Sequence, residues 1–289
     1  MTSTLDLASL QTWIGREETL HDMVTPELVG RFYATFDVDA AAPAPGDIAP
    51  RLIHYCLAQS ADRMSELGAD GHPERGGFLP PIPLPRRMWA SGVLSFPDEI
   101  RVGERVVRRS RVADIQVKSG RTGELCFVTV EHRIESADRL AVEERQILVY
   151  REAPGSNAPA AVNSPVQAVD ERPKATIEVT PPLLFRYSAL TFNSHRIHYD
   201  RRYTVEVERY PGLVVHGPLQ ATLLMNLAID LRRGMRPSRV EFRAGSPLFD
   251  DAPVQLFAEE RADGSLRLWT ARPGGPEAMV AEAHWGEGR

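Results

Sequence analysis

Cysteine is scarce in this chain, with only Cys56 and Cys126 present and no metal-binding spacing between them. A disulfide-rich scaffold and a structural zinc site are therefore excluded, and we expect no metal. Positive charge is also not in excess, because 34 Lys and Arg face 39 Asp and Glu, for a net charge of −5. This balance argues against a nucleic-acid partner. The short basic pairs at 86–87 and 232–233 are interpreted as solvated surface, although an anionic substrate tail could use one.

Long apolar runs are missing as well. No stretch reaches the roughly 18 residues that a membrane-spanning helix needs. The first residues, with Asp6, Glu17 and Glu18, lack the basic and apolar layout of a signal peptide. We therefore expect a cytoplasmic protein that does not act at a membrane.

Several catalytic motifs are absent too. The sequence has no Gly-rich phosphate loop and no nucleophile elbow, since Ser188 and Ser194 lack the flanking glycines. The paired carboxylates at 143–144 and 250–251 are interpreted as solvated turns and strand edges. Phosphoryl transfer and serine-based acyl transfer are thus not supported.

Proline marks the organisation of the chain. Residues 157–176 are rich in Pro, Ala and short polar residues and predict a linker. On each side the order of elements is similar, with helical material first and alternating strands after it. We predict an N-terminal half, 1–156, that covers the site and holds the substrate tail, and a catalytic C-terminal half, 177–289.

The second half contains the clearest helix. Residues 219–231 are apolar around most of the helical wheel, so this helix must be wrapped on all sides. Pro218 suits the first helical turn, and Gly234 follows the end. Strands are predicted at 238–243, 253–261, 266–272 and 278–285. A long buried helix inside a curling antiparallel sheet predicts an α+β fold.

In the first half, helices are predicted at 28–36 and 48–57. Strands are predicted at 106–118, 124–134 and 140–150. Residues 76–85 are too rich in proline for either, and we predict an extended covering segment there.

Residues 193–200 hold an amide and an imidazole five positions apart on an irregular stretch. Adding water to a double bond conjugated with a carbonyl needs one group that takes a proton from water and one that orients the water. A neutral imidazole has suitable basicity near pH 7, which indicates His198 as the base. Asn193 cannot act as a base, but its amide can hold the water. On spacing alone, both residues are equally well explained as polar loop residues.

Gly217 precedes Pro218 at the predicted start of the wrapped helix. The first N–H groups of a helix are unpaired, and its dipole favours negative charge at that end. A thioester oxygen placed there would be stabilised as it becomes an enolate. We therefore predict Gly217 as the oxyanion donor, with an ordinary helix cap as the alternative. His216 is interpreted as a packed loop residue.

Three neighbours of the predicted pair are candidates for substrate binding. His195 could be a second base or could hold the loop by hydrogen bonds. Arg196 could bind a substrate carboxylate or a phosphate, and an ion pair with Asp200 is the alternative. Tyr199, together with Tyr187, is predicted to line the acyl slot.

The sequence Phe-Asn-Ser-His-Arg-Ile-His-Tyr-Asp at 192–200, followed by His-Gly at 216–217, resembles the motifs of MaoC-like R-specific enoyl thioester hydratases and dehydratases. The usual pattern is Asp-x-Asn-Pro-x-His, so Asn193, His195 and Arg196 depart from it. A branch that includes mesaconyl-C4-CoA (3-methylfumaryl-CoA) hydratases and mitochondrial hydroxyacyl-thioester dehydratases shares these departures. Residues 76–81 and 85–89 are also similar to that branch, so the resemblance spans nearly the whole chain.

This resemblance implies a double hot-dog fold, with Asn193 and His198 as the catalytic pair and Gly217 as the oxyanion donor. Because Asn replaces Asp, the proton-transfer steps fall to His198, acting through water. The implied activity is that of a hydro-lyase on an enoyl thioester, and mesaconyl-C4-CoA giving citramalyl-CoA is the leading reaction. The substrate is an acyl-CoA whose coenzyme A is part of the substrate, so no separate cofactor is expected, and a homodimer is one expectation for the assembly.

Other functions remain open on the sequence alone. One alternative is a 3-hydroxyacyl thioester dehydratase of fatty-acid metabolism. Another is an acyl-CoA thioesterase on the same scaffold, for which Glu206 and Glu208 are the nearby carboxylates. The last is a non-catalytic acyl-CoA binder, because a fold alone does not determine function.

Overall fold

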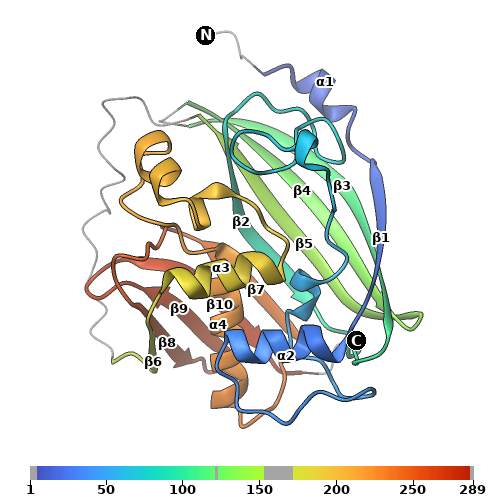
Figure 1. The fold of residues 1–289 in the computed structure, drawn as a ribbon, viewed down its shortest axis with the longest axis vertical. Coiled ribbons are helices and arrows are strands. Elements are labelled where there is room, and N and C mark those ends of the chain that lie inside the picture. The colour runs from blue at the N-terminus through green and yellow to red at the C-terminus, as the bar shows by residue number, and fades with distance from the viewer. Residues whose placement is uncertain (1–4, 121–122, 153–171, 287–289) are drawn as a thin grey trace.

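The computed structural model describes residues 5–120, 123–152 and 172–286 (Figure 1). Its ten strands form one sheet in the order β1-β3-β4-β5-β2-β7-β10-β9-β8-β6, and every neighbouring pair is antiparallel. The strands are β1 Glu17–Met23, β2 Arg86–Ser95, β3 Arg105–Gly120, β4 Gly123–Ser136, β5 Arg139–Arg151, β6 Ala175–Ile177, β7 Arg239–Ala244, β8 Val254–Glu260, β9 Leu266–Ala271 and β10 Glu277–His284.

The two halves of the chain meet where β2 pairs with β7. Residues 91–95 of β2 lie opposite residues 239–243 of β7. The sheets of the two halves thereby join edge to edge into one continuous surface, which Figure 1 shows as green strands running into orange and red ones. The predicted linker, 157–176, lies outside the described residues as far as 171, and its last two residues belong to β6.

The second half holds the wrapped helix that the sequence predicts. The helix α4, Gly217–Leu231, packs against β8, β9 and β10, and most of its residues are buried, among them Leu219, Leu224 and Met225. The other regular helices are α1 Leu7–Gln11, α2 Pro26–Thr35 and α3 Pro181–Leu190. Helices α2 and α3 lie side by side, with Phe36 and Tyr187 in edge-to-face contact (Figure 1). Within the described ranges, no helix is long and apolar enough to cross a membrane.

The helix predicted at 48–57 is wrong. Only a short 3-10 turn, η1 Ile53–Cys56, forms there. Leu52, directly before it, has a positive φ of 66°, which an α-helix cannot contain, and Pro50 lacks an N–H donor. This turn packs on the sheet of the first half, where the Tyr55 hydroxyl donates to Glu144 of β5 at 3.1 Å.

The proline-rich segment at 76–85 is an extended cover, as predicted. Ile82 and Leu84 are fully buried, and they pack in a cluster with Val112 and Tyr150 on the sheet. Strand β2 follows directly, so the pair at 86–87 lies in a central strand and is not solvated surface. Arg86 is buried and forms an ion pair with Glu208, which corrects the sequence interpretation.

Candidate active site

The predicted catalytic segment begins where α3 ends. Phe192 has a positive φ of 49° and turns the chain out of the helix. The N–H of Asn193 then donates to the Ser188 carbonyl at 2.8 Å, and the Oδ1 of Asn193 accepts from the N–H of His195 at 3.0 Å. Because this turn uses Oδ1 as an acceptor, the side-chain NH2 of Asn193 remains available to donate hydrogen bonds to another group.

His198 ends the short 3-10 turn η3, Arg196–His198, and is buried. Its Nδ1 lies 2.7 Å from the carbonyl oxygen of Val214. Since a carbonyl can only accept, Nδ1 carries the proton and Nε2 is left with a free lone pair. Burial lowers the pKa of His198 to about 4, although the Val214 hydrogen bond opposes the change. At pH 7 the ring is therefore neutral and able to act as a base.

His216 lies directly against this imidazole. The rings of His198 and His216 stack with centroids 3.6 Å apart, and Nε2 of His216 is hydrogen-bonded to Oγ of Ser188 at 2.9 Å. Burial lowers the pKa of His216 well below its usual range. The sequence interpretation of a packed residue is thus confirmed, but it missed that His216 positions His198. The only signal was its place directly before Gly217.

Helix α4 begins at Gly217, with His216 as its N-cap residue and Pro218 in the first turn. The N–H of Gly217 has no partner within the helix, because no carbonyl lies four residues before it in the helix. A Cβ on Gly217 would come within 3.1 Å of the indole ring of Trp89. Glycine at this position therefore makes room for Trp89, a reason that the sequence did not reveal.

A loop of the first half, residues 69–71, holds the predicted catalytic segment, residues 193–198, in place. The Ser194 hydroxyl donates to the Gly71 carbonyl, and the N–H of Arg196 donates to the Asp70 carbonyl at 2.9 Å. A side-chain N–H of Arg196 also donates to the Ala69 carbonyl at 3.0 Å. The first half thus fixes the segment from which His198 projects.

Two of the predicted substrate-binding residues have partners within the protein. Arg196 forms an ion pair with Asp200 at 2.8 Å and lies over the ring of Tyr203 at 4.1 Å. This ion pair is the alternative that the sequence left open for Arg196. Tyr199 is half-exposed, and its hydroxyl donates to the Ser194 carbonyl at 3.0 Å.

His195 packs between His198 and His72. Its ring centroid lies 5.4 Å from that of His198 and 3.9 Å from that of His72, whose Nδ1 donates to Asp70 at 3.0 Å. Burial and then the charge of Arg87 lower the pKa of His72 to about 4, against the opposing effect of Asp70. Burial also lowers the pKa of His195 far below its usual range. Sequence reasoning missed Asp70 and His72.

Asp70, His72 and His195 have potential ligand atoms within 4.8 Å of one another. Two imidazoles and a carboxylate are a donor set that suits a divalent transition metal. The hydrogen bond from His72 nevertheless already uses the carboxylate, and it holds the pKa of Asp70 well below its usual range, although burial acts in the opposite direction.

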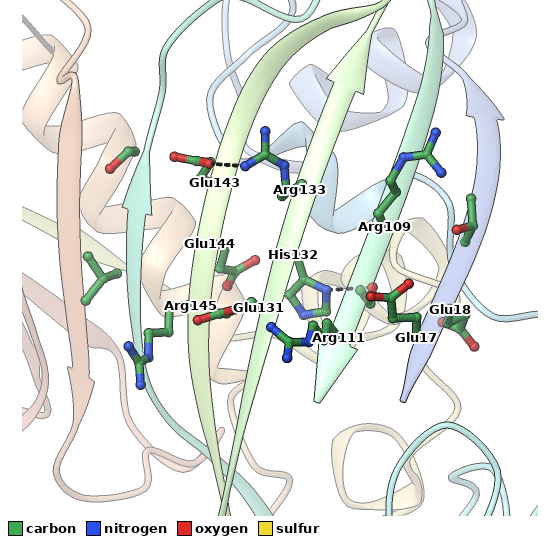
Figure 2. Close-up of a pocket in the computed structure, with 14 residues that line it drawn as sticks. Glu17, Glu18, Arg109, Arg111, Glu131, His132, Arg133, Glu143, Glu144 and Arg145 are labelled. Carbon is green, nitrogen blue, oxygen red and sulfur yellow. Dashed lines mark hydrogen bonds and ion pairs between the residues drawn. The ribbon is translucent and has the colours of Figure 1, made fainter. Parts of the chain in front are cut away.

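A second polar cluster lies in the first half, away from His198. A hollow of about 560 Å³ over β1, β3, β4 and β5 is lined by charged side chains, among which Glu143 pairs with Arg133 (Figure 2). The neighbouring Glu144 is buried and accepts from Tyr55, with His54 Nε2 at 3.6 Å. The interpretation of the pair at 143–144 as solvated is therefore wrong for Glu144. No predicted site residue lines this hollow.

The two candidates for the carboxylate base of a thioesterase are each paired with an arginine. Glu206 pairs with the exposed Arg202 at 2.9 Å. Glu208 pairs with Arg86 and also accepts from the Tyr203 hydroxyl at 3.1 Å.

The chain is similar in sequence to several known proteins. A family model described as hydroxyacyl-thioester dehydratase type 2 matches residues 52–250. The chain is 42% identical over 280 residues to the mesaconyl-C4-CoA hydratase of Chloroflexus aurantiacus, which covers 96% of this chain and 99% of that protein. It is 26% identical over 263 residues to the mitochondrial hydroxyacyl-thioester dehydratase type 2 of Schizosaccharomyces pombe, covering 82% of this chain and 83% of that one.

The fold has solved counterparts. A Mycobacterium tuberculosis protein described as a double hotdog fold superposes with a TM-score of 0.55 at 15% identity, covering 93% of this chain and 95% of that one. The architecture predicted from the sequence is thereby confirmed.

Proposed function

The chain belongs to the hydroxyacyl-thioester dehydratase type 2 family, and on this basis we propose that it is a hydro-lyase that converts mesaconyl-C4-CoA to citramalyl-CoA reversibly. The observation that carries the choice of substrate is the 42% identity with a mesaconyl-C4-CoA hydratase across nearly the full length of both chains. The buried neutral imidazole of His198 supplies the base that this chemistry requires.

In the proposed mechanism, Nε2 of His198 takes a proton from water. The resulting hydroxide adds to the β-carbon of the enoyl thioester, and the electrons of the double bond move to the thioester oxygen. The imidazolium then returns the proton to the α-carbon, so the ring ends the cycle neutral. Because Val214 fixes the proton on Nδ1, only Nε2 takes part in the exchange.

Asn193 and Gly217 are proposed to assist this step. The side-chain NH2 of Asn193 donates to the attacking water, while its Oδ1 stays in the turn with His195. The N–H of Gly217, at the start of α4, donates to the enolate oxygen, where the helix dipole adds to the effect. Removing one such donor typically slows turnover by roughly 100-fold or more.

A second candidate function is dehydration of a 3-hydroxyacyl thioester, which is the reverse reaction on a substrate with a different acyl group. It is supported by the family match and by the Schizosaccharomyces pombe relative. The same groups would serve, with His198 removing the α-proton. The two functions differ in the acyl group that the site accepts.

A spectrophotometric screen distinguishes these functions. Hydration of mesaconyl-C4-CoA bleaches the absorbance of the conjugated thioester and releases no thiol. Substrates of interest are mesaconyl-C4-CoA, crotonyl-CoA and a long-chain enoyl-CoA, each followed in parallel with a thiol reagent. The proposal requires the highest kcat/KM on mesaconyl-C4-CoA. A preference for the long chain would favour the dehydratase, and stoichiometric thiol release would favour a thioesterase.

The cytoplasmic location and the homodimer expected from the sequence stay predictions. Coenzyme A enters this proposal only as part of the substrate.

A further inference from the structure

The proposed substrate carries a free carboxylate close to the reacting atoms. In mesaconyl-C4-CoA, this carboxylate is bonded to the same carbon that receives the hydroxyl group. Its partner in the protein must therefore lie within a few ångströms of the water held by His198. A carboxylate that leaves bulk water needs a charged, hydrogen-bonding partner to offset its desolvation.

Three arginines near the catalytic segment are already engaged by other groups. Arg196 is paired with Asp200, and Arg86 with Glu208. Arg75 donates to the carbonyls of Leu84 and Pro85. Among the described residues, Arg87 makes no ion pair with any carboxylate, although it is half-buried.

The fold directs Arg87 toward the site. Residues two apart on a strand share a face, so Arg87 projects on the same side of β2 as Trp89. The indole of Trp89 lies against Gly217 at the start of α4. On the next strand, Tyr150 is the register partner of Arg87. Burial raises the pKa of the Tyr150 hydroxyl, and the charge and a hydrogen bond of the Arg87 guanidinium act against this rise. The guanidinium and the buried hydroxyl are thus adjacent.

The charges around His72 leave room for an anion. The groups that act on this ring are Arg87 and Arg75, both positive, and Asp70, which is negative and already bonded to His72. Arg87 also acts on His195, whose ring lies against His198. One carboxylate bound between Arg87 and His195 would balance the excess positive charge.

We propose that Arg87, with the Tyr150 hydroxyl, binds the free carboxylate of a dicarboxylic enoyl-CoA beside the catalytic segment and so selects this substrate class. The planar guanidinium can hold a carboxylate through two parallel hydrogen bonds, which lysine cannot reproduce. The proposal rests on the proposed function, because it names the group by which that function's substrate is recognised.

The test compares two substrates that differ only at the carboxylate. In 3-methylcrotonyl-CoA, a methyl group replaces the carboxylate of mesaconyl-C4-CoA. The measured quantity is the ratio of kcat/KM for the two, in the native protein and in Arg87→Gln, Arg87→Lys and Arg196→Gln. We expect Arg87→Gln to lower this ratio about 100-fold, since losing one partner of a desolvated pair has an effect of this order. Arg87→Lys lowers it less, and Arg196→Gln leaves it unchanged. If Arg87→Gln does not fold, Arg87→Lys is the test: a lowered ratio supports the role of Arg87, and an unchanged ratio overturns it.

A binding measurement separates this inference from the proposed function. Calorimetry with the unreactive succinyl-CoA and butyryl-CoA should show tighter binding of succinyl-CoA, and Arg87→Gln should abolish the difference. Equal losses on both substrates, or a selective loss in Arg196→Gln, would overturn the assignment. If the native protein hydrates crotonyl-CoA but not mesaconyl-C4-CoA, the proposed function fails, and the succinyl-CoA preference alone then decides the role of Arg87.

Discussion

A Cβ atom on Gly71 would overlap the carbonyl oxygen of Ser194, so the loop of the first half and the catalytic segment meet at backbone contact distance. The positive φ of 87° at Gly71 is a second reason for glycine there. The Ser194 hydroxyl also donates a hydrogen bond to the Gly71 carbonyl. The position of His198, four residues further on, therefore depends on residue 71 of the other half.

Gly71→Ala should displace the catalytic segment. We expect kcat to fall about 100-fold, the effect of a displacement of roughly 1 Å at a reacting group. Gly46→Ala is the matched control, because Gly46 has a similar φ of 92° but no atom within 4 Å of its Cβ position. Steady-state kinetics of both variants, with circular dichroism to confirm folding, measure the difference. Similar activity in the two would mean that the contact at Ser194 does not position the site.

The pH profile of kcat/KM should reveal a buried base. Because burial lowers the pKa of His198 to about 4 from an ordinary 6.5, the ring stays neutral well below pH 6. We expect activity to remain level between pH 8 and about 5 and to decline toward pH 4. An acid limb centred near 6.5 would show that the base is solvent-exposed or is another residue.

Stability should fall over the same acid range. The pKa values of His72, His132 and His198 are each lowered by burial to about 4 in the folded protein. The unfolded chain therefore binds more protons than the folded chain between pH 6.5 and 4. The free energy of unfolding therefore has its full value above pH 6.5 and decreases as the pH falls toward 4. Thermal unfolding at steps of pH measures this, and a Tm that is constant across the window would contradict it.

The adjacent residues Glu143 and Glu144 should contribute very differently to stability. Glu144→Ala leaves Tyr55 and His54 without a buried partner, and we expect a loss of about 3 kcal/mol. Glu143→Ala removes only a half-exposed ion pair with Arg133, for a loss below about 1 kcal/mol. Urea unfolding of the two variants gives both values. Equal losses in the two variants would contradict this prediction, because they would show that Tyr55 and His54 do not depend on Glu144 for stability.

Chelation should leave turnover unchanged. Asp70 already accepts from His72, and the proposed steps use His198, the side-chain NH2 of Asn193 and the N–H of Gly217. Kinetics before and after dialysis against EDTA test this. A loss of activity that a divalent cation restores would assign a catalytic metal to Asp70, His72 and His195.

The sequence predicted the elements whose signals are local. Helix α4 could be predicted because its residues are apolar around the whole wheel, and the irregular stretch that holds His198 because its motif is contiguous. The prediction of a helix at 48–57 was wrong because Leu52 adopts a left-handed conformation, which a leucine in the sequence does not indicate. Strand β2 was not predicted, because it is a central strand that begins with two arginines. One of them, Arg86, is buried and pairs with Glu208.

The remaining site residues could not be predicted because they come from the other half. No periodicity places His72 against His195, which is more than 100 residues away in the chain. Similarly, Glu144 looks solvated until η1 brings Tyr55 onto it. The first of these contacts joins the two halves and the second forms within the first half, and neither can be predicted from a single segment.

The most direct test of the proposed function is hydration of mesaconyl-C4-CoA in water enriched in heavy oxygen, with the native protein and His198→Asn. We expect the native protein to place one heavy oxygen on the β-carbon of an intact CoA thioester. We expect His198→Asn to lose roughly 100-fold or more in rate. Heavy oxygen in a free carboxylic acid released from CoA, or undiminished hydration by His198→Asn, would contradict the proposed function.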